Sequence, residues 1–170
     1  MSFTIREWWG LIHGMGLGAL FLLAFAGGIA ELYSLKPALI TREGIQKRMK
    51  RLKVGVVGMA AAAWGTVITG TWIVYPWYRE ETATSAKSRL LANPATADWH
   101  EFGMEWKEHI AWISPILATV VAFIVVYYGT NLIRHERVRR TAMTLFVMSF
   151  SFAAIAGAFG AFITKVAPVK

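Results

Sequence analysis

The stretch IAWISPILATVVAFIVVYYGTNL, from Ile110 to Leu132, contains no acidic side chain, no basic side chain and no histidine. Tyrosine is the only residue type in it that titrates. A bilayer core of roughly 30 Å requires about 20 consecutive apolar residues of a helix that crosses it. The stretch therefore predicts a transmembrane helix.

Three further runs have a similar length and composition: Trp8–Ala30, Val54–Tyr75 and Thr141–Thr164. A soluble bundle of four buried helices would show a polar stripe that recurs about every 3.6 residues along each helix, and none of the four runs has one. Hydrophobic residues make up 56% of the 170. The sequence thus predicts an all-α protein with one domain over residues 1–170, a bundle of four transmembrane helices.

Basic residues concentrate in two of the connections between these runs. Seven lie between the first and second runs and four between the third and fourth (Lys36, Arg42, Lys47, Arg48, Lys50, Arg51, Lys53; Arg134, Arg137, Arg139, Arg140). The positive-inside rule places these connections in the cytoplasm, and it places both termini and the connection 76–109 outside. We expect a multi-pass protein of the cytoplasmic (inner) membrane.

The basic loop 35–53 is expected to bind anionic lipids, through a short amphipathic helix that starts at Arg42. Because its charges lie next to the membrane rather than on an independent domain, nucleic acid is not an expected partner. In the connection 76–109, Asn93-Pro94 predicts a turn. Asp98 or Thr96 is predicted to cap a helix that begins outside the membrane and continues into the third run.

Two histidines lie near the outer ends of two runs. His13 follows the Trp8-Trp9 pair by four to five residues, and His109 follows Trp106 by three. Taking tryptophan as a marker of the membrane interface, a rise of about 1.5 Å per residue places both within about 7 Å of the same face. A haem b with two axial imidazoles needs ligands at matching depth and no cysteine. The sequence predicts one haem b held by His13 and His109.

Neighbouring residues support this interpretation. Gly14 is one of four glycines around His13 that allow a macrocycle or a helix to approach closely. Glu105, four residues before His109, is predicted to accept its second imidazole proton through the carboxylate. Four basic residues on the same side are predicted to be available for haem propionates: Arg79, Lys87, Arg89 and Lys107.

The spacing also predicts which residues face the bundle interior. Residues four apart lie on one helix face, so Glu101, Glu105 and His109 are expected to face inward. His100 and Met104 are expected on faces nearer water or a partner.

Two alternatives remain open. His100 and Met104, also four residues apart, would suit copper at an oxidising surface. Alternatively, the chain binds no cofactor and is an accessory or assembly subunit of a membrane complex, packed through faces rich in alanine and glycine at Met59–Ala63 and Ala153–Ala161. No nucleophile–base arrangement occurs in any run, so we expect no independent enzymatic activity.

The four-run layout with two histidines resembles the small four-helix b-type membrane cytochromes, the haem-bearing anchor subunits of redox complexes. Two stretches resemble family signatures: AFAGGIAELYSL (24–35) and TGTWIVYPWYR (69–79). The resemblance implies electron transfer between a periplasmic redox carrier and quinone, or within a larger respiratory or photosynthetic complex. Members with two haems need a second histidine pair near the inner face, where this sequence has only His135.

The charge pattern makes a testable prediction about topology. Reporter fusions at Ser2, Lys87 and Lys170 should all report the outer side, because the basic connections are retained in the cytoplasm. A cytoplasmic signal at Lys87 would contradict this orientation.

Overall fold

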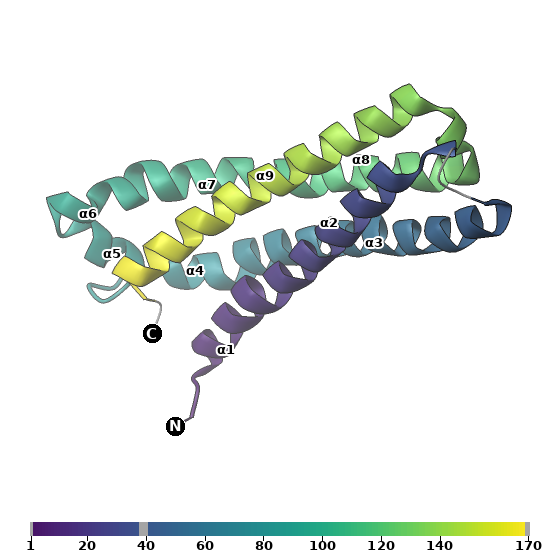
Figure 1. Cartoon of the computed structure of the whole chain (residues 1–170). Helices are drawn as coiled ribbons and strands as arrows, with labels where there is room; N and C mark the ends of the chain where they lie inside the picture. The colour runs from purple at the N-terminus through teal and green to yellow at the C-terminus, as the bar shows by residue number, and fades with distance from the viewer. Residues whose placement is uncertain (1, 38–40, 169–170) are drawn as a thin grey trace.

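The computed structural model describes residues 2–37 and 41–168, without the side chain of Arg42. The described chain is all-helical, and four helical spans form one antiparallel bundle (Figure 1). The spans are Ile5–Ser34, Glu43–Tyr78, Pro94–Arg134 and Glu136–Val166, numbered here 1 to 4. Each is long and apolar enough to cross a membrane.

The spans are built from shorter helical segments. Span 1 contains α1 (Ile5–Leu11), the π-helix η1 (Ile12–Gly16) and α2 (Leu17–Ser34). Span 2 contains α3 (Arg42–Thr69), the π-helix η3 (Gly70–Val74) and α4 (Tyr75–Tyr78), and α5 (Ala86–Leu91) follows it. Span 3 contains α6 (Pro94–Asp98), the π-helix η4 (Trp99–Met104), α7 (Glu105–Ile110), α8 (Ile113–Tyr128) and the 3₁₀ turn η5 (Gly129–Arg134), whereas span 4 is the single helix α9 (Glu136–Val166).

Both chain ends lie at one end of the bundle together with α5 and α6, and we call this the terminal end (Figure 1). The opposite end, with the two arginine- and lysine-rich connections, is the basic end. All three π-helical turns belong to the half of the bundle nearer the terminal end. Such turns break the regular hydrogen-bond ladder and are often found at functional sites.

Two local predictions at the connections are wrong. The residue that caps α6 is Asn93, whose side chain accepts a hydrogen bond from the Ala95 amide, and neither Asp98 nor Thr96 does so. Pro94 then occupies the first turn of the helix, where its missing N–H costs nothing. At the basic end, Arg42–Lys53 is not a separate surface helix but the start of α3.

The basic end is fastened by arginines that bind the end of span 1. Arg51 forms an ion pair with Glu31 at 2.8 Å, and Arg139, which is buried, donates to the backbone carbonyl of Leu35. The last carbonyls of a helix have no partner within the helix. Span 4 therefore satisfies a group that span 1 would otherwise leave unpaired.

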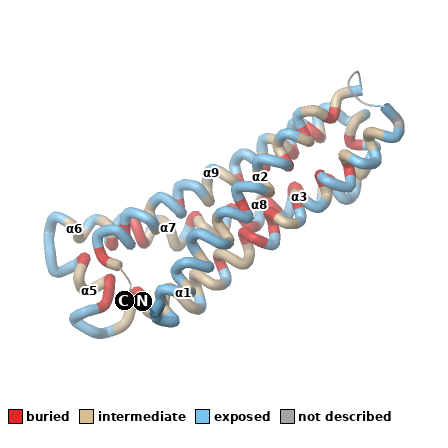
Figure 2. Tube along the Cα trace, turned by 60° about the horizontal axis from the view of Figure 1, so that its bottom comes forward, coloured by how far each residue is buried: buried red, intermediate tan, exposed pale blue. Residues whose placement is uncertain are grey.

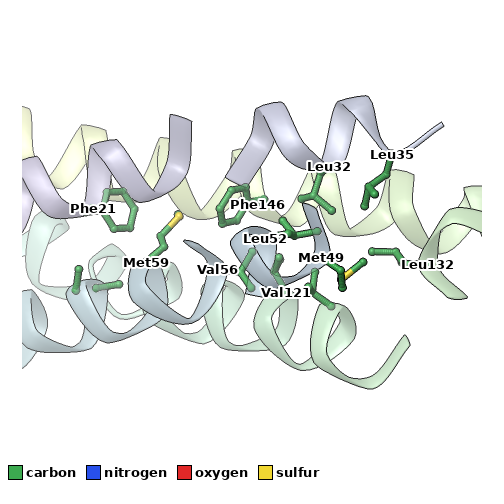
Figure 3. Close-up of a cluster of buried hydrophobic side chains, with 13 residues drawn as sticks. Phe21, Leu32, Leu35, Met49, Leu52, Val56, Met59, Val121, Leu132 and Phe146 are labelled. Atoms are coloured by element: carbon green, nitrogen blue, oxygen red, sulfur yellow. The ribbon is translucent and has the colours of Figure 1, made fainter. Parts of the chain in front are cut away.

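The main core fills the half of the bundle nearer the basic end (Figures 2 and 3). Gly28 and Gly55 allow spans 1 and 2 to approach, since a Cβ at Gly55 would be 3.9 Å from the Cα of Gly28. The ring of Phe146, fully buried, lies against Gly28, where a Cβ would be 2.8 Å from two ring carbons. This contact ties spans 1, 2 and 4 together.

A methyl group at Gly28 should therefore disrupt the core. We expect Gly28→Ala to lower the free energy of unfolding by about 1–3 kcal/mol, because the enclosed Phe146 ring has no space to move into. Gly27→Ala is the matched control: a Cβ there meets no heavy atom within 4 Å. Thermal unfolding in detergent, followed by circular dichroism, should separate the two variants. Equal melting temperatures would show that the close contact does not form.

Candidate functional site

His13 lies in the π-helix η1 and points at span 2. Its Nδ1 is 2.9 Å from Thr69 Oγ1, and its Cε1 is 2.9 Å from the place where a Cβ on Gly70 would be. Only glycine leaves room for the imidazole at that position. Gly70 begins the π-helix η3, so two irregular turns on neighbouring spans hold this histidine.

The hydrogen bonds of Thr69 determine the tautomer of His13. The Thr69 hydroxyl has one proton, which it donates to the backbone carbonyl of Gly65 at 2.7 Å. Thr69 Oγ1 must then accept from His13, so the Nδ1 of His13 carries the proton. In the neutral imidazole, Nε2 is left with a lone pair that can accept a hydrogen bond or bind a metal.

Lys107 reaches into the bundle from span 3. Its Cε is 3.3 Å and its Nζ 3.8 Å from the place of a Cβ on Gly160 of span 4, and it interacts electrostatically with His13 of span 1. Lys107 is half-buried, and within residues 2–37 and 41–168 it has no hydrogen-bond or ion-pair partner; Glu108 acts on its charge at longer range. A lysine that is partly removed from water in this way normally has a partner. We call His13, Thr69, Gly70 and Lys107 the His13–Lys107 site.

The structure does not bring His109 to His13. His109 is exposed, and on one helix it lies about 200° around from Lys107, two residues earlier, whose side chain lies against Gly160 of span 4. The two histidines also differ in depth. Trp112, already three residues deeper than His109, packs on Trp72 with ring centroids 6.3 Å apart, whereas His13 sits beside the still deeper Gly70. The tryptophans that suggested equal depths are therefore not at one level.

The predicted facing of residues 100–109, in the first half of span 3, is wrong. His100 and Met104 are buried, with 7% and 6% of their surface exposed, whereas Glu101 and His109 are exposed. His100 Nδ1 is 2.8 Å from the hydroxyl of Tyr78. In the described part of the chain no three His, Cys, Asp or Glu side chains form a metal-binding group, and the copper site at His100 and Met104 stays a prediction.

Arg79 joins spans 2 and 3 at the terminal end. Its guanidinium forms ion pairs with Glu105 and, at 3.4 Å, with Glu108. Glu108 also accepts a hydrogen bond of 2.8 Å from the Tyr75 hydroxyl. Partial burial opposes the charge of Arg79, but the two carboxylates and Tyr75 outweigh it and raise the pKa of Arg79 above its ordinary value.

The Glu105 carboxylate is thus engaged by Arg79. The proton on His109 Nδ1 goes instead to the backbone carbonyl of Glu105, at 2.6 Å. The predicted hydrogen bond from His109 to the Glu105 carboxylate is therefore not formed, and the role of Arg79 toward propionates stays a prediction.

Spans 1 and 4 separate on the side of the His13–Lys107 site. Phe25 stacks on Phe150 with ring centroids 4.1 Å apart, and beyond Phe21 the two spans diverge toward the terminal end (Figure 1). Gly18 precedes Phe21 by three residues in α2 and so continues the same face of span 1, and Gly14 lies one turn further, in the π-helix η1. A Cβ at either glycine would meet no heavy atom within 4 Å, and the same is true of Gly157 on span 4. Both faces are open beside the site.

No protein-family model, curated protein sequence or solved structure matches this chain.

The sequence indicated Lys107 only as one of the cations available for haem propionates, not as an inward-pointing residue, and it gave no role to Thr69. A signal for Lys107 was present, because Gly103, Ile110 and Ser114 lie four residues before and three and seven residues after it, on one small or apolar face. All three are buried. A lysine in the middle of such a face indicates an inward-pointing cation. Thr69 gave no comparable signal, since a threonine in an apolar helix ordinarily bonds to its own backbone.

Proposed function

We propose that this protein is a membrane subunit of a redox complex and that its His13–Lys107 site binds a quinone. The observation that carries the proposal is the imidazole Nε2 lone pair of His13 together with the half-buried Lys107, which interacts electrostatically with His13 and has no acceptor in the described chain. Ionisable groups inside a membrane span are costly and usually mark a functional site.

The chemistry of a quinone matches both groups. Lys107 Nζ would donate to a ring oxygen, and His13 Nε2 would accept the hydroxyl proton of the reduced form. The flat ring suits the open glycine faces of spans 1 and 4, and its isoprenoid tail would leave into the lipid between these spans. Electrons would pass to another subunit of the complex or to a periplasmic carrier.

The proposal takes the terminal end as the outer end of the protein, in the cytoplasmic membrane. The support is the charge distribution, since the basic connections 35–53 and 134–140 lie at the opposite end. Protons from a bound quinol would then have Glu108 and Glu105 between the site and outer water. Both carboxylates are partly exposed.

Haem b is the second candidate. The free Nε2 of His13 favours it, because a hydrogen-bonded Nδ1 is the usual arrangement in a metal-ligating histidine. Lys107 would suit a haem propionate. The second predicted ligand, His109, does not face the site, so the residues present fit haem less well than quinone, and we derive no electron-transfer step through it.

Binding of a short-tailed quinone to the full chain in nanodiscs tests the proposal, with quenching of intrinsic tryptophan fluorescence as the signal. Lys107→Met and His13→Gln should each weaken binding by about tenfold or more, equivalent to about 1.4 kcal/mol for the loss of one hydrogen bond to the ligand. His109→Gln is the matched control, because His109 is exposed on the opposite face.

Equal affinity in Lys107→Met and the wild type would contradict the quinone site. The visible spectrum of the same preparation tests the second candidate. The absorption bands of a six-coordinate b haem, abolished by His13→Ala, would replace quinone with haem at this site.

A further inference from the structure

A separate cavity of about 260 Å³ opens at the terminal end, away from the His13–Lys107 site. It lies between the start of span 1, the end of span 2, α5 and the residues after α9. Its polar lining consists of two arginines, one carboxylate and three hydroxyl groups (Arg6, Arg89; Glu80; Thr82, Thr84, Ser85). A cavity of this size holds a tetrahedral anion together with part of a larger headgroup.

Within the described chain, Arg89 is the arginine of this cavity that forms no ion pair with a carboxylate, whereas Arg6 pairs with Glu80. One of its terminal nitrogens donates to the backbone carbonyl of Pro168, and within the described chain its Nε is buried without a hydrogen-bond partner. The side chain is held in place because α5 is anchored by Ala86 and Leu90, both buried. A guanidinium has five N–H donors, so Arg89 has donors to spare for a ligand.

The charge balance of the cavity favours an anion. Glu80 is bound by Arg6 through two hydrogen bonds, of 2.5 and 3.1 Å, so its negative charge is compensated. Arg89 then supplies a net positive charge. The hydroxyls of Thr82 and Thr84, 3.4 Å apart, add neutral donors on the exposed side.

We infer that this cavity binds a phosphate group, as free phosphate or as the phosphate of a lipid headgroup. Arginine is suited to this ligand because its planar fork of N–H donors matches two phosphate oxygens. Trp77 forms part of the wall, with the Arg6 guanidinium 5.6 Å from its ring centroid. Tryptophan is enriched at the level of lipid headgroups, so a cavity beside Trp77 is at the depth where lipid phosphates lie. This inference is independent of the quinone proposal.

The test compares two matched pairs of variants. Thr84→Glu places a negative charge at the exposed rim, and Thr84→Gln has the same length without the charge. Arg89→Gln removes the cation, and Arg137→Gln removes an exposed arginine at the other end of the protein. The melting temperature of the full chain is measured in detergent with rising inorganic phosphate, and separately in phosphatidylcholine nanodiscs with and without phosphatidylglycerol.

A ligand that binds only the folded state raises the melting temperature. We expect the anion-dependent rise in the wild type, Thr84→Gln and Arg137→Gln, and its loss in Thr84→Glu and Arg89→Gln. A rise with inorganic phosphate identifies a soluble anion, whereas a rise only with phosphatidylglycerol identifies a lipid headgroup. The Thr84 pair keeps the test valid if Arg89→Gln fails to fold. The inference is overturned if the wild type shows no rise in either setting, or if Thr84→Glu retains the rise seen in Thr84→Gln.

Discussion

The contact between Gly28 and the Phe146 ring fixes where span 1 meets the rest of the bundle. Spans 1, 2 and 4 converge at this point, and the ring pairs of Phe21 and Phe25 with Phe150 extend the contact toward the terminal end. In a membrane, helices associate through close packing rather than through burial from water, so small residues decide where they touch. Beyond Phe21, glycine on both faces leaves nothing to fill the space between the diverging spans.

The open glycine faces of spans 1 and 4 lie beside the polar groups of the His13–Lys107 site. Lys107 and His13 lie where spans 1 and 4 have separated, and η1 and η3 hold the imidazole against span 2. A fully packed end would have covered the lysine with apolar side chains and left it unpaired in a low-dielectric interior. The quinone proposal rests on this unpaired cation, for which a ligand that enters from the lipid would supply the acceptor.

The sequence was sufficient for the four spans, because twenty or more apolar residues in a row have one structural meaning. It was insufficient for the site, because spacing shows which residues share a helix face but not which face turns inward. His109 and Lys107 lie on opposite faces of α7; His109, predicted to face inward, is exposed, and Lys107 lies against Gly160 of span 4. The tryptophans were also poor markers for the depths of His13 and His109 in the membrane. Trp8, Trp106 and Trp112 each pack on a different aromatic ring, so they need not lie at the same depth. The Thr69–His13 hydrogen bond joins residues 56 apart in the chain, and no local sequence pattern predicts such a contact.

Disulfide formation between paired cysteines tests most directly whether His13, rather than His109, faces the interior beside span 2. The chain contains no cysteine, so each pair can be introduced without background. His13→Cys with Gly70→Cys should cross-link rapidly under mild oxidation in membranes, because the His13 ring lies 2.9 Å from the place of a Cβ on Gly70 and the two positions therefore face each other. His13→Cys with His109→Cys should remain reduced. Rapid cross-linking of the second pair and none of the first would mean that span 3 presents His109 to span 1, and the His13–Lys107 site would not exist.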